Sequence, residues 1–186
     1  MPQALQASVA AQAWARRVVA SNDHAGQPFV IVDKQAALVV LHHGDGSVAG
    51  LAPALLGRQP GDHSLPGVGW RTQAGTLQVQ DMTTPAGRFV ARVGLNHTRE
   101  TVLWIEEHTA LALHRLRPGR QYADRARALT RPGTAGRRLT AGCVVVSAAF
   151  FDATVAPLFG NRGGIVYVLP EHGPWPNPGS SLYAAG

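Results

Sequence analysis

The sequence predicts a mainly β fold, a β-sandwich of mixed sheets with one or two short helices. Short runs rich in Val, Ile and Leu recur between turn residues, as expected of a sandwich. A chain of 186 residues can bury one core but is too short for two ordinary domains. Its 45% hydrophobic and 15% charged residues indicate a folded protein, and 21 glycines with 13 prolines indicate many turns.

The first predicted element is a helix over residues 4–20. Leu5, Val9, Trp14 and Val18 form a loose apolar stripe among alanines, which are strong helix formers. This stripe has to pack either on the rest of the chain or on another protein.

The middle of the chain predicts β-strands separated by turns and two long loops. Gly44-Asp45-Gly46 indicates a tight turn, whereas 57–75 and 115–138 contain Pro-Gly pairs typical of longer loops. Ser147 is a suitable N-cap for a short helix that ends before Gly160, and the last strand follows it. The predicted strands are 29–33, 36–42, 48–55, 76–80, 88–93, 101–106, 109–114 and 165–169.

Cys143 is the single cysteine, and it follows Thr140-Ala141-Gly142. A thiol becomes a strong nucleophile when an imidazole or a backbone dipole favours its thiolate. His114, which closes the apolar run 111–113, is the candidate base, although a solitary cysteine is also commonly a buried small hydrophobe. We predict Cys143 as nucleophile, with backbone N–H groups of Gly142 and Cys143 as donors to an oxyanion.

These residues resemble the signature of the L,D-transpeptidases, YkuD-type enzymes in which a histidine precedes Ser/Thr-x-Gly-Cys. A second segment, Thr84-Pro85-Ala86-Gly87-Arg88-Phe89, is similar to the family's Thr-Pro-x-Gly-x-Phe. The resemblance implies a YkuD-like β-sandwich over 29–169, with a helical extension at 1–28 and a tail at 170–186. Val145 departs from the family, which usually carries Arg or Asn there.

The resemblance also implies further site residues near Cys143. Thr140 and Ala141 of the motif would bind substrate. Arg137 or Arg138 would replace the polar contact missing at Val145. The orienting partner of His114 is not identifiable from the sequence.

The activity implied by the resemblance is acyl transfer on peptidoglycan stem peptides. Cys143 would form a thioester with a stem tetrapeptide and release D-alanine, and carbapenems would acylate the same sulfur. With water as acceptor the enzyme would be an L,D-carboxypeptidase, and with turnover lost the chain would be a peptidoglycan-binding module. A cell-envelope or periplasmic location follows, with an export signal or anchor expected in the natural precursor.

The net charge and the histidines bear on nucleic-acid binding and metal binding. The net charge is +6, and eight of the sixteen arginines lie between Arg115 and Arg138. A nucleic-acid interface would need aromatic platforms, and this stretch offers only Tyr122, so we do not favour nucleic-acid binding. The arginines form either a solvated loop or a surface that attracts an anionic cell-wall polymer. His42, His43, Asp62 and His63 lack metal-ligand spacing, so we predict no metal and no cofactor. No apolar stretch has the length of a membrane span.

Overall fold

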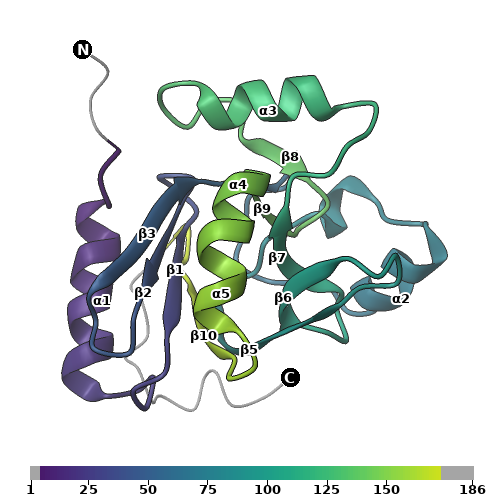
Figure 1. Ribbon diagram of the computed structural model, residues 1–186. Helices are drawn as coiled ribbons and strands as arrows, with labels where there is room; N and C mark the ends of the chain where they lie inside the picture. The colour runs from purple at the N-terminus through teal and green to yellow at the C-terminus, as the bar shows by residue number, and fades with distance from the viewer. Residues whose placement is uncertain (1–4, 173–186) are drawn as a thin grey trace.

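The computed structural model describes residues 5–172, in which one curved mixed sheet wraps around a helical segment (Figure 1). The eight strands follow the order β3-β2-β1-β10-β5-β6-β7-β9. Their bounds are β1 Phe29–Asp33, β2 Leu38–His42, β3 Val48–Pro53, β5 Gly87–Leu95, β6 Thr101–Glu106, β7 Leu111–Arg115, β9 Val144–Val146 and β10 Gly164–Val168. The mainly β prediction is confirmed.

Strand β5 divides this sheet into two halves. Residues 87–91 pair with β10, whereas residues 92–95 pair with β6. Each half contains one parallel pair, β1 with β10 in the first half and β7 with β9 in the second. A second, two-stranded parallel sheet joins β4 (Leu56–Gly57) to β8 (Arg138–Thr140) beside β9.

The main core lies on the concave side of the sheet. A continuous helical segment crosses it, and its buried Phe151, Val155 and Phe159 repeat every four residues and so share one face. Ser147 caps its start by accepting a hydrogen bond from the Phe150 N–H at 3.2 Å, as the sequence predicts. The segment comprises α4 (Ala148–Phe150), a π-helical turn η2 (Phe151–Val155) and α5 (Ala156–Phe159).

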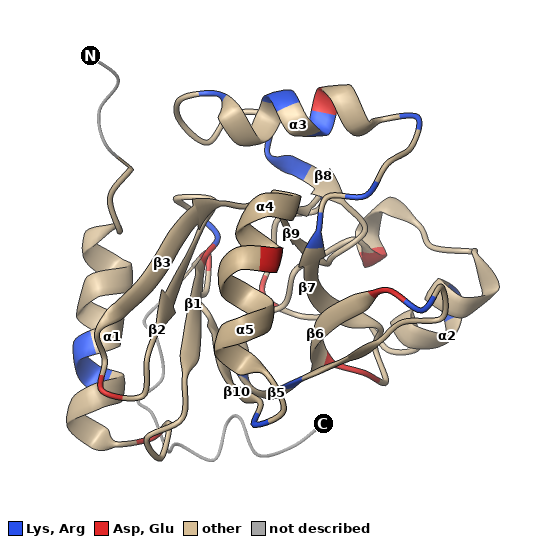
Figure 2. Ribbon diagram, viewed as in Figure 1, with Lys and Arg blue, Asp and Glu red and all other residues tan. Residues whose placement is uncertain are grey.

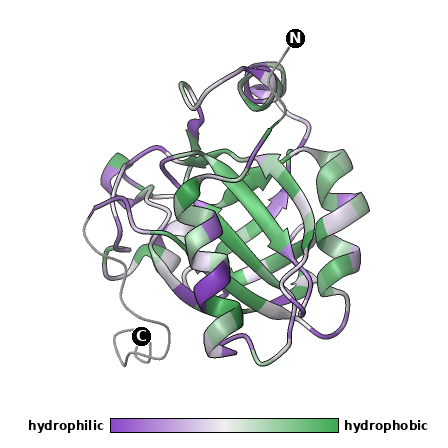
Figure 3. Cartoon of the chain, turned by 90° about the vertical axis from the view of Figure 1, so that its left-hand side faces the viewer, coloured by the Kyte–Doolittle hydropathy of each residue, from purple (hydrophilic) through white to green (hydrophobic). Residues whose placement is uncertain are grey.

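Helix α1 (Val9–Ser21) covers the outer face of β1 and β10. Trp14 is buried there, with its ring 6.2 Å from that of Tyr167 in an edge contact. Because α1 covers one face of β1 and the helical segment covers the other, all five residues of β1 are buried. Figure 3 shows the hydrophobic sheet between its flanking helices. Trp14 and Val18 of the predicted stripe therefore pack on their own chain, whereas Leu5 and Val9 are exposed. The helix begins at Val9 and not at residue 4 as predicted.

Three predicted irregular or extended segments have a different structure. The loop 57–75 contains α2 (Val68–Ala74), and the loop 115–138 contains α3 (Tyr122–Thr130). The predicted strand 76–80 is wrong, since residues 79–81 form a 3₁₀ turn whose Asp81 accepts from the Gln78 N–H at 2.9 Å. No helix in residues 5–172 has the length and apolar character needed to cross a membrane. Most of the predicted tail, 173–186, lies outside the described residues.

Candidate active site

The strands β7 and β9 bring His114 and Cys143 to one face of the sheet. Leu113 pairs with Val144 and His114 with Val145, while Cys143 directly precedes β9. Paired residues of parallel strands point to the same face, and side chains alternate along each strand. His114, Val145 and Cys143 therefore share a face, and Leu113 and Val144 point into the main core on the other.

Backbone groups of Ala110 and Ala112, at the start of β7, lie against the Cys143 sulfur. The thiol donates to the Ala110 carbonyl oxygen at 3.5 Å. Burial raises the pKa of the Cys143 thiol, while the Ala112 N–H and the charge of Arg117 act in the opposite direction. The resting state is a thiol, and the thiolate that forms on deprotonation has a backbone donor and a cation beside it.

His114 has one ring nitrogen fixed by the backbone. Its Nδ1 lies 2.8 Å from the Arg115 carbonyl oxygen, which can only accept, so Nδ1 carries the proton and Nε2 keeps its lone pair. Burial lowers the pKa of His114 to about 4, helped by Arg117 and opposed by the hydrogen bond to Arg115. His114 is therefore a neutral base at pH 7.

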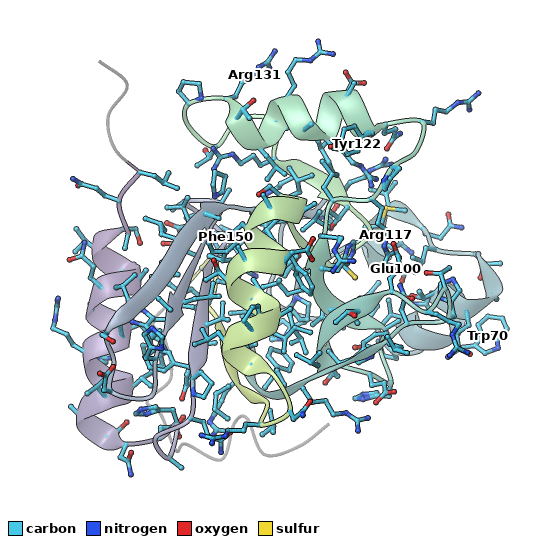
Figure 4. All side chains as sticks on the ribbon, in the orientation of Figure 1. Trp70, Glu100, Arg117, Tyr122, Arg131 and Phe150 are labelled. Atoms are coloured by element: carbon cyan, nitrogen blue, oxygen red, sulfur yellow. The ribbon has the colours of Figure 1, made fainter. Side chains whose placement is uncertain are left out.

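The orienting partner that the sequence did not identify is the Arg115 carbonyl. Every residue has a backbone carbonyl, so the sequence contains no residue type that would identify this partner. An ion pair completes the surroundings: the Arg117 Nε lies 2.7 Å from the Glu100 Oε2. Figure 4 shows these two labelled residues side by side. Glu100 follows the turn before β6, so only the pairing of β6 with β7 brings it here.

The cysteine motif is folded by hydrogen bonds to threonine side chains. The Thr140 hydroxyl donates to the Cys143 carbonyl at 2.7 Å and accepts from the Gly142 N–H at 3.1 Å. The Thr84 hydroxyl donates to the Gly142 carbonyl at 2.6 Å. The two segments that carry the family resemblance therefore meet at Gly142.

The close contact of these two segments requires glycine at position 142. Its φ is +133°, and a Cβ there would lie 2.9 Å from the Thr83 carbonyl oxygen. Because the Gly142 N–H is already bonded to Thr140, it is not free for an oxyanion in this state. The Cys143 N–H, which donates to no acceptor in residues 5–172, is the free member of the expected pair.

A small cavity of about 50 Å³ adjoins Cys143. Ala141, Gly142 and Cys143 line it together with residues 83 and 85 of the Thr-Pro segment, residues 109–111 before β7, and parts of 64–81 including α2. This volume holds a few water molecules or a small chemical group. The segment 57–75 thus supplies one of the walls of this cavity.

Val145 and the two predicted arginines lie outside this cavity. Val145 is 2% exposed and packs with Leu55 and Leu129 beneath α3. Arg137 is buried and donates to three carbonyls, those of Ala37, Ala128 and Arg131. Arg138 donates to the Gly57 carbonyl and pairs with Glu171. The role of Arg137 and Arg138 in substrate binding stays a prediction.

The histidines considered for metal binding lie in other surroundings. His42 is buried and stacks on Phe29 at 4.6 Å, with Nδ1 2.9 Å from the Gly46 carbonyl. Within residues 5–172, no three His, Cys, Asp or Glu side chains come together as a metal site.

Comparisons with known proteins add structural likenesses. No family model and no curated protein matches the sequence. Among solved structures, an L,D-transpeptidase from Xylanimonas cellulosilytica DSM 15894 (residues 123–326) is 16% identical, with 77% of this chain and 60% of that chain covered and a TM-score of 0.48. The catalytic domain of the E. faecium L,D-transpeptidase is 17% identical, with 77% and 98% covered and a TM-score of 0.41.

A third similar structure is an L,D-transpeptidase in complex with imipenem. It is 14% identical, with 76% of this chain and 58% of that chain covered and a TM-score of 0.42. This chain thus spans about 60% of the first of these structures and 58% of the third. Several solved structures that resemble this chain are L,D-transpeptidases, and the TM-scores lie below 0.5, so the chemistry has to be argued from the residues of the site.

Proposed function

We propose that the protein is an L,D-transpeptidase that transfers an acyl group of a peptidoglycan stem peptide through a thioester on Cys143. The observation that carries the proposal is the hydrogen bond from the His114 Nδ1–H to the Arg115 carbonyl at 2.8 Å. It leaves Nε2 as a base on the same face of β7 and β9 as the sulfur. Binding alone would not require this arrangement.

In the first step, the Cys143 sulfur attacks the carbonyl carbon of the third stem residue while Nε2 of His114 takes the thiol proton. The carbonyl oxygen becomes an oxyanion, for which the Cys143 N–H is the available backbone donor. The C–N bond to D-alanine then breaks, and the nitrogen leaves with the proton that His114 returns. The products are a thioester and free D-alanine.

In the second step, an acceptor attacks the thioester. An amine from a neighbouring stem forms an amide crosslink, whereas water gives a shortened peptide, and in both cases His114 takes the acceptor's proton and returns one to the departing sulfur. The low pKa of His114 supports this role because the imidazole is unprotonated at neutral pH. A cell-envelope location belongs to the same proposal.

The decisive experiment incubates purified muropeptides with the protein and with Cys143→Ala, followed by mass spectrometry. We expect loss of D-alanine or formation of dimers with the wild type alone. Dimers indicate transpeptidation, and shortened monomers indicate carboxypeptidase activity. Circular dichroism of both proteins controls for folding.

Two results would overturn the mechanism. Products formed by Cys143→Ala would remove the sulfur from the reaction. Unchanged muropeptides that nevertheless bind to the folded wild type would identify a peptidoglycan-binding module instead. Acylation of intact wild type by imipenem, read as a mass increase absent from Cys143→Ala, tests the nucleophile without any acceptor.

A further inference from the structure

We propose that the concavity at the start of α3 binds a carboxylate of the peptide substrate. It has a volume of about 400 Å³ and is formed by residues 117–122 and Arg125. This size is in the range of pockets that take small ligands. The inference rests on the proposed function, since it assigns a subsite to the same substrate.

Three guanidinium groups line this concavity with little negative charge to balance them. Arg117 pairs with Glu100, and Arg125 donates to the Leu139 carbonyl at 3.2 Å. In residues 5–172, Arg120 has neither an ion pair nor a side-chain hydrogen bond, so the pocket keeps an excess of positive charge. Figure 2 shows the basic residues along α3 and its flanking segments. Guanidinium groups bind carboxylates with two parallel hydrogen bonds.

The start of α3 reinforces the attraction for an anion. Its N-cap, Gln121, makes no side-chain capping bond. The first N–H groups of a helix carry partial positive charge, which adds to that of the arginines. Tyr122 is 46% exposed and offers an apolar ring to the rest of a bound peptide.

The concavity adjoins the reacting groups through Arg117. The charge of Arg117 acts on the pKa of both His114 and Cys143, and the charge of Arg125 acts on that of His114. Arg117 follows His114 by three residues, just after β7 ends at Arg115, so the concavity begins where the strand that carries the base ends. A tetrapeptide attacked at its third residue carries its terminal carboxylate one residue beyond the reacting carbonyl, which makes this carboxylate a suitable ligand.

The test compares a stem tetrapeptide with the same peptide carrying a C-terminal amide. Arg120→Gln is the informative variant because its side chain has no structural hydrogen bond. Arg131→Gln removes the same charge at the other end of α3 and is the control; Figure 4 shows Arg131 and Tyr122 at opposite ends of the helix. We expect Arg120→Gln to lower kcat/KM for the free acid about tenfold or more, since charge-assisted hydrogen bonds have effects of this size.

The peptide with a C-terminal amide shows which carboxylate of the substrate the concavity binds. If the terminal carboxylate is the ligand, the amide is already a poor substrate for the wild type, and Arg120→Gln changes its turnover less than twofold. If amidation of another carboxyl group of the peptide abolishes the effect of Arg120→Gln instead, the pocket binds that group. Equal kcat/KM of wild type and Arg120→Gln on all peptides would overturn the inference.

A binding measurement separates this inference from the proposed function. In the Cys143→Ala background, calorimetry is expected to show about tenfold tighter binding of the free acid than of the amide, and loss of that difference with Arg120→Gln. Turnover by the wild type without this discrimination refutes only the subsite. Discrimination without any turnover or imipenem acylation by the wild type refutes only the proposed enzyme.

Discussion

The buried Lys34 and the partly buried pair of His114 and Cys143 are titratable groups with opposite relations to their surroundings. The Lys34 ammonium donates to the Gly61 carbonyl at 2.5 Å, to Asp62 at 2.7 Å and to the Thr84 carbonyl at 2.9 Å, which uses all three protons. His114 Nε2 has no protein hydrogen bond within residues 5–172. A buried group with every bond satisfied stabilises the fold, whereas one with a free lone pair is available for chemistry.

His114→Gln tests whether the free lone pair of the imidazole takes part in the chemistry. Loss of the base is expected to lower the rate of imipenem acylation by about 10²–10⁴-fold, the usual contribution of a positioned proton acceptor. Stopped-flow fluorescence with mass detection measures this rate. His108→Gln removes an exposed histidine from the turn before β7 and is the matched control. A rate within threefold of wild type for His114→Gln would exclude the imidazole from the reaction.

Lys34→Met tests whether the fully bonded ammonium stabilises the fold. Removing the ammonium leaves two carbonyls and the Asp62 carboxylate without their donor, and breaking a buried pair in this way costs about 3 kcal/mol. The Asp62 carboxylate still accepts from the Glu171 N–H at 2.8 Å, which limits the loss. Urea unfolding measures the change, with exposed Arg127→Met as control. An unchanged midpoint for Lys34→Met would show that this cluster is not structural.

Val145→Asn introduces the polar residue that the resemblance to L,D-transpeptidases leads one to expect at this position. Position 145 lies under α3, so the amide would be buried without a partner, at a cost of about 1–3 kcal/mol. We expect a lower Tm and no gain in acylation. Val145→Ala separates lost packing from added polarity. Increased acylation with unchanged Tm would instead place position 145 beside the substrate.

The strands were predictable because their apolar runs are bounded by turn residues. The run 29–33 has no polar alternation, and the structure explains this by covering both faces of β1. Helix α3 was missed since Pro118-Gly119 and Pro132-Gly133 were interpreted as loop residues. They instead flank nine residues that include three Ala, two Arg and one Leu, which favour a helix. Pro-Gly pairs mark the limits of an element as well as turns within a loop.

The residues of the candidate site are recognisable from short local motifs, but the contacts between those motifs are not. Cys143 and His114 were identified from local patterns. The contact of Glu100 with Arg117, and that of Thr84 with Gly142, depend on pairing between distant segments, which no single sequence window contains. The low pKa of His114 depends on burial by segments that are distant in the sequence, so no local pattern predicts it.

The pH dependence of acylation tests whether His114 is neutral in the folded protein. A histidine with an ordinary pKa of about 6.5 would be only about one-tenth neutral at roughly pH 5.5. With its pKa lowered to about 4, His114 stays neutral there, so imipenem acylation is expected to change less than about twofold between roughly pH 5.5 and 7.5.

The same shift has a consequence for stability. The unfolded state binds a proton at His114 below about pH 6.5 while the folded state does so only near 4, so this contribution to stability is complete above 6.5 and is lost as the pH falls toward 4. His114→Gln should remove that part of the slope from the unfolding free energy. A tenfold fall in acylation by about pH 5.5, with the slope unchanged in the variant, would mean that the imidazole is exposed to water and free to titrate.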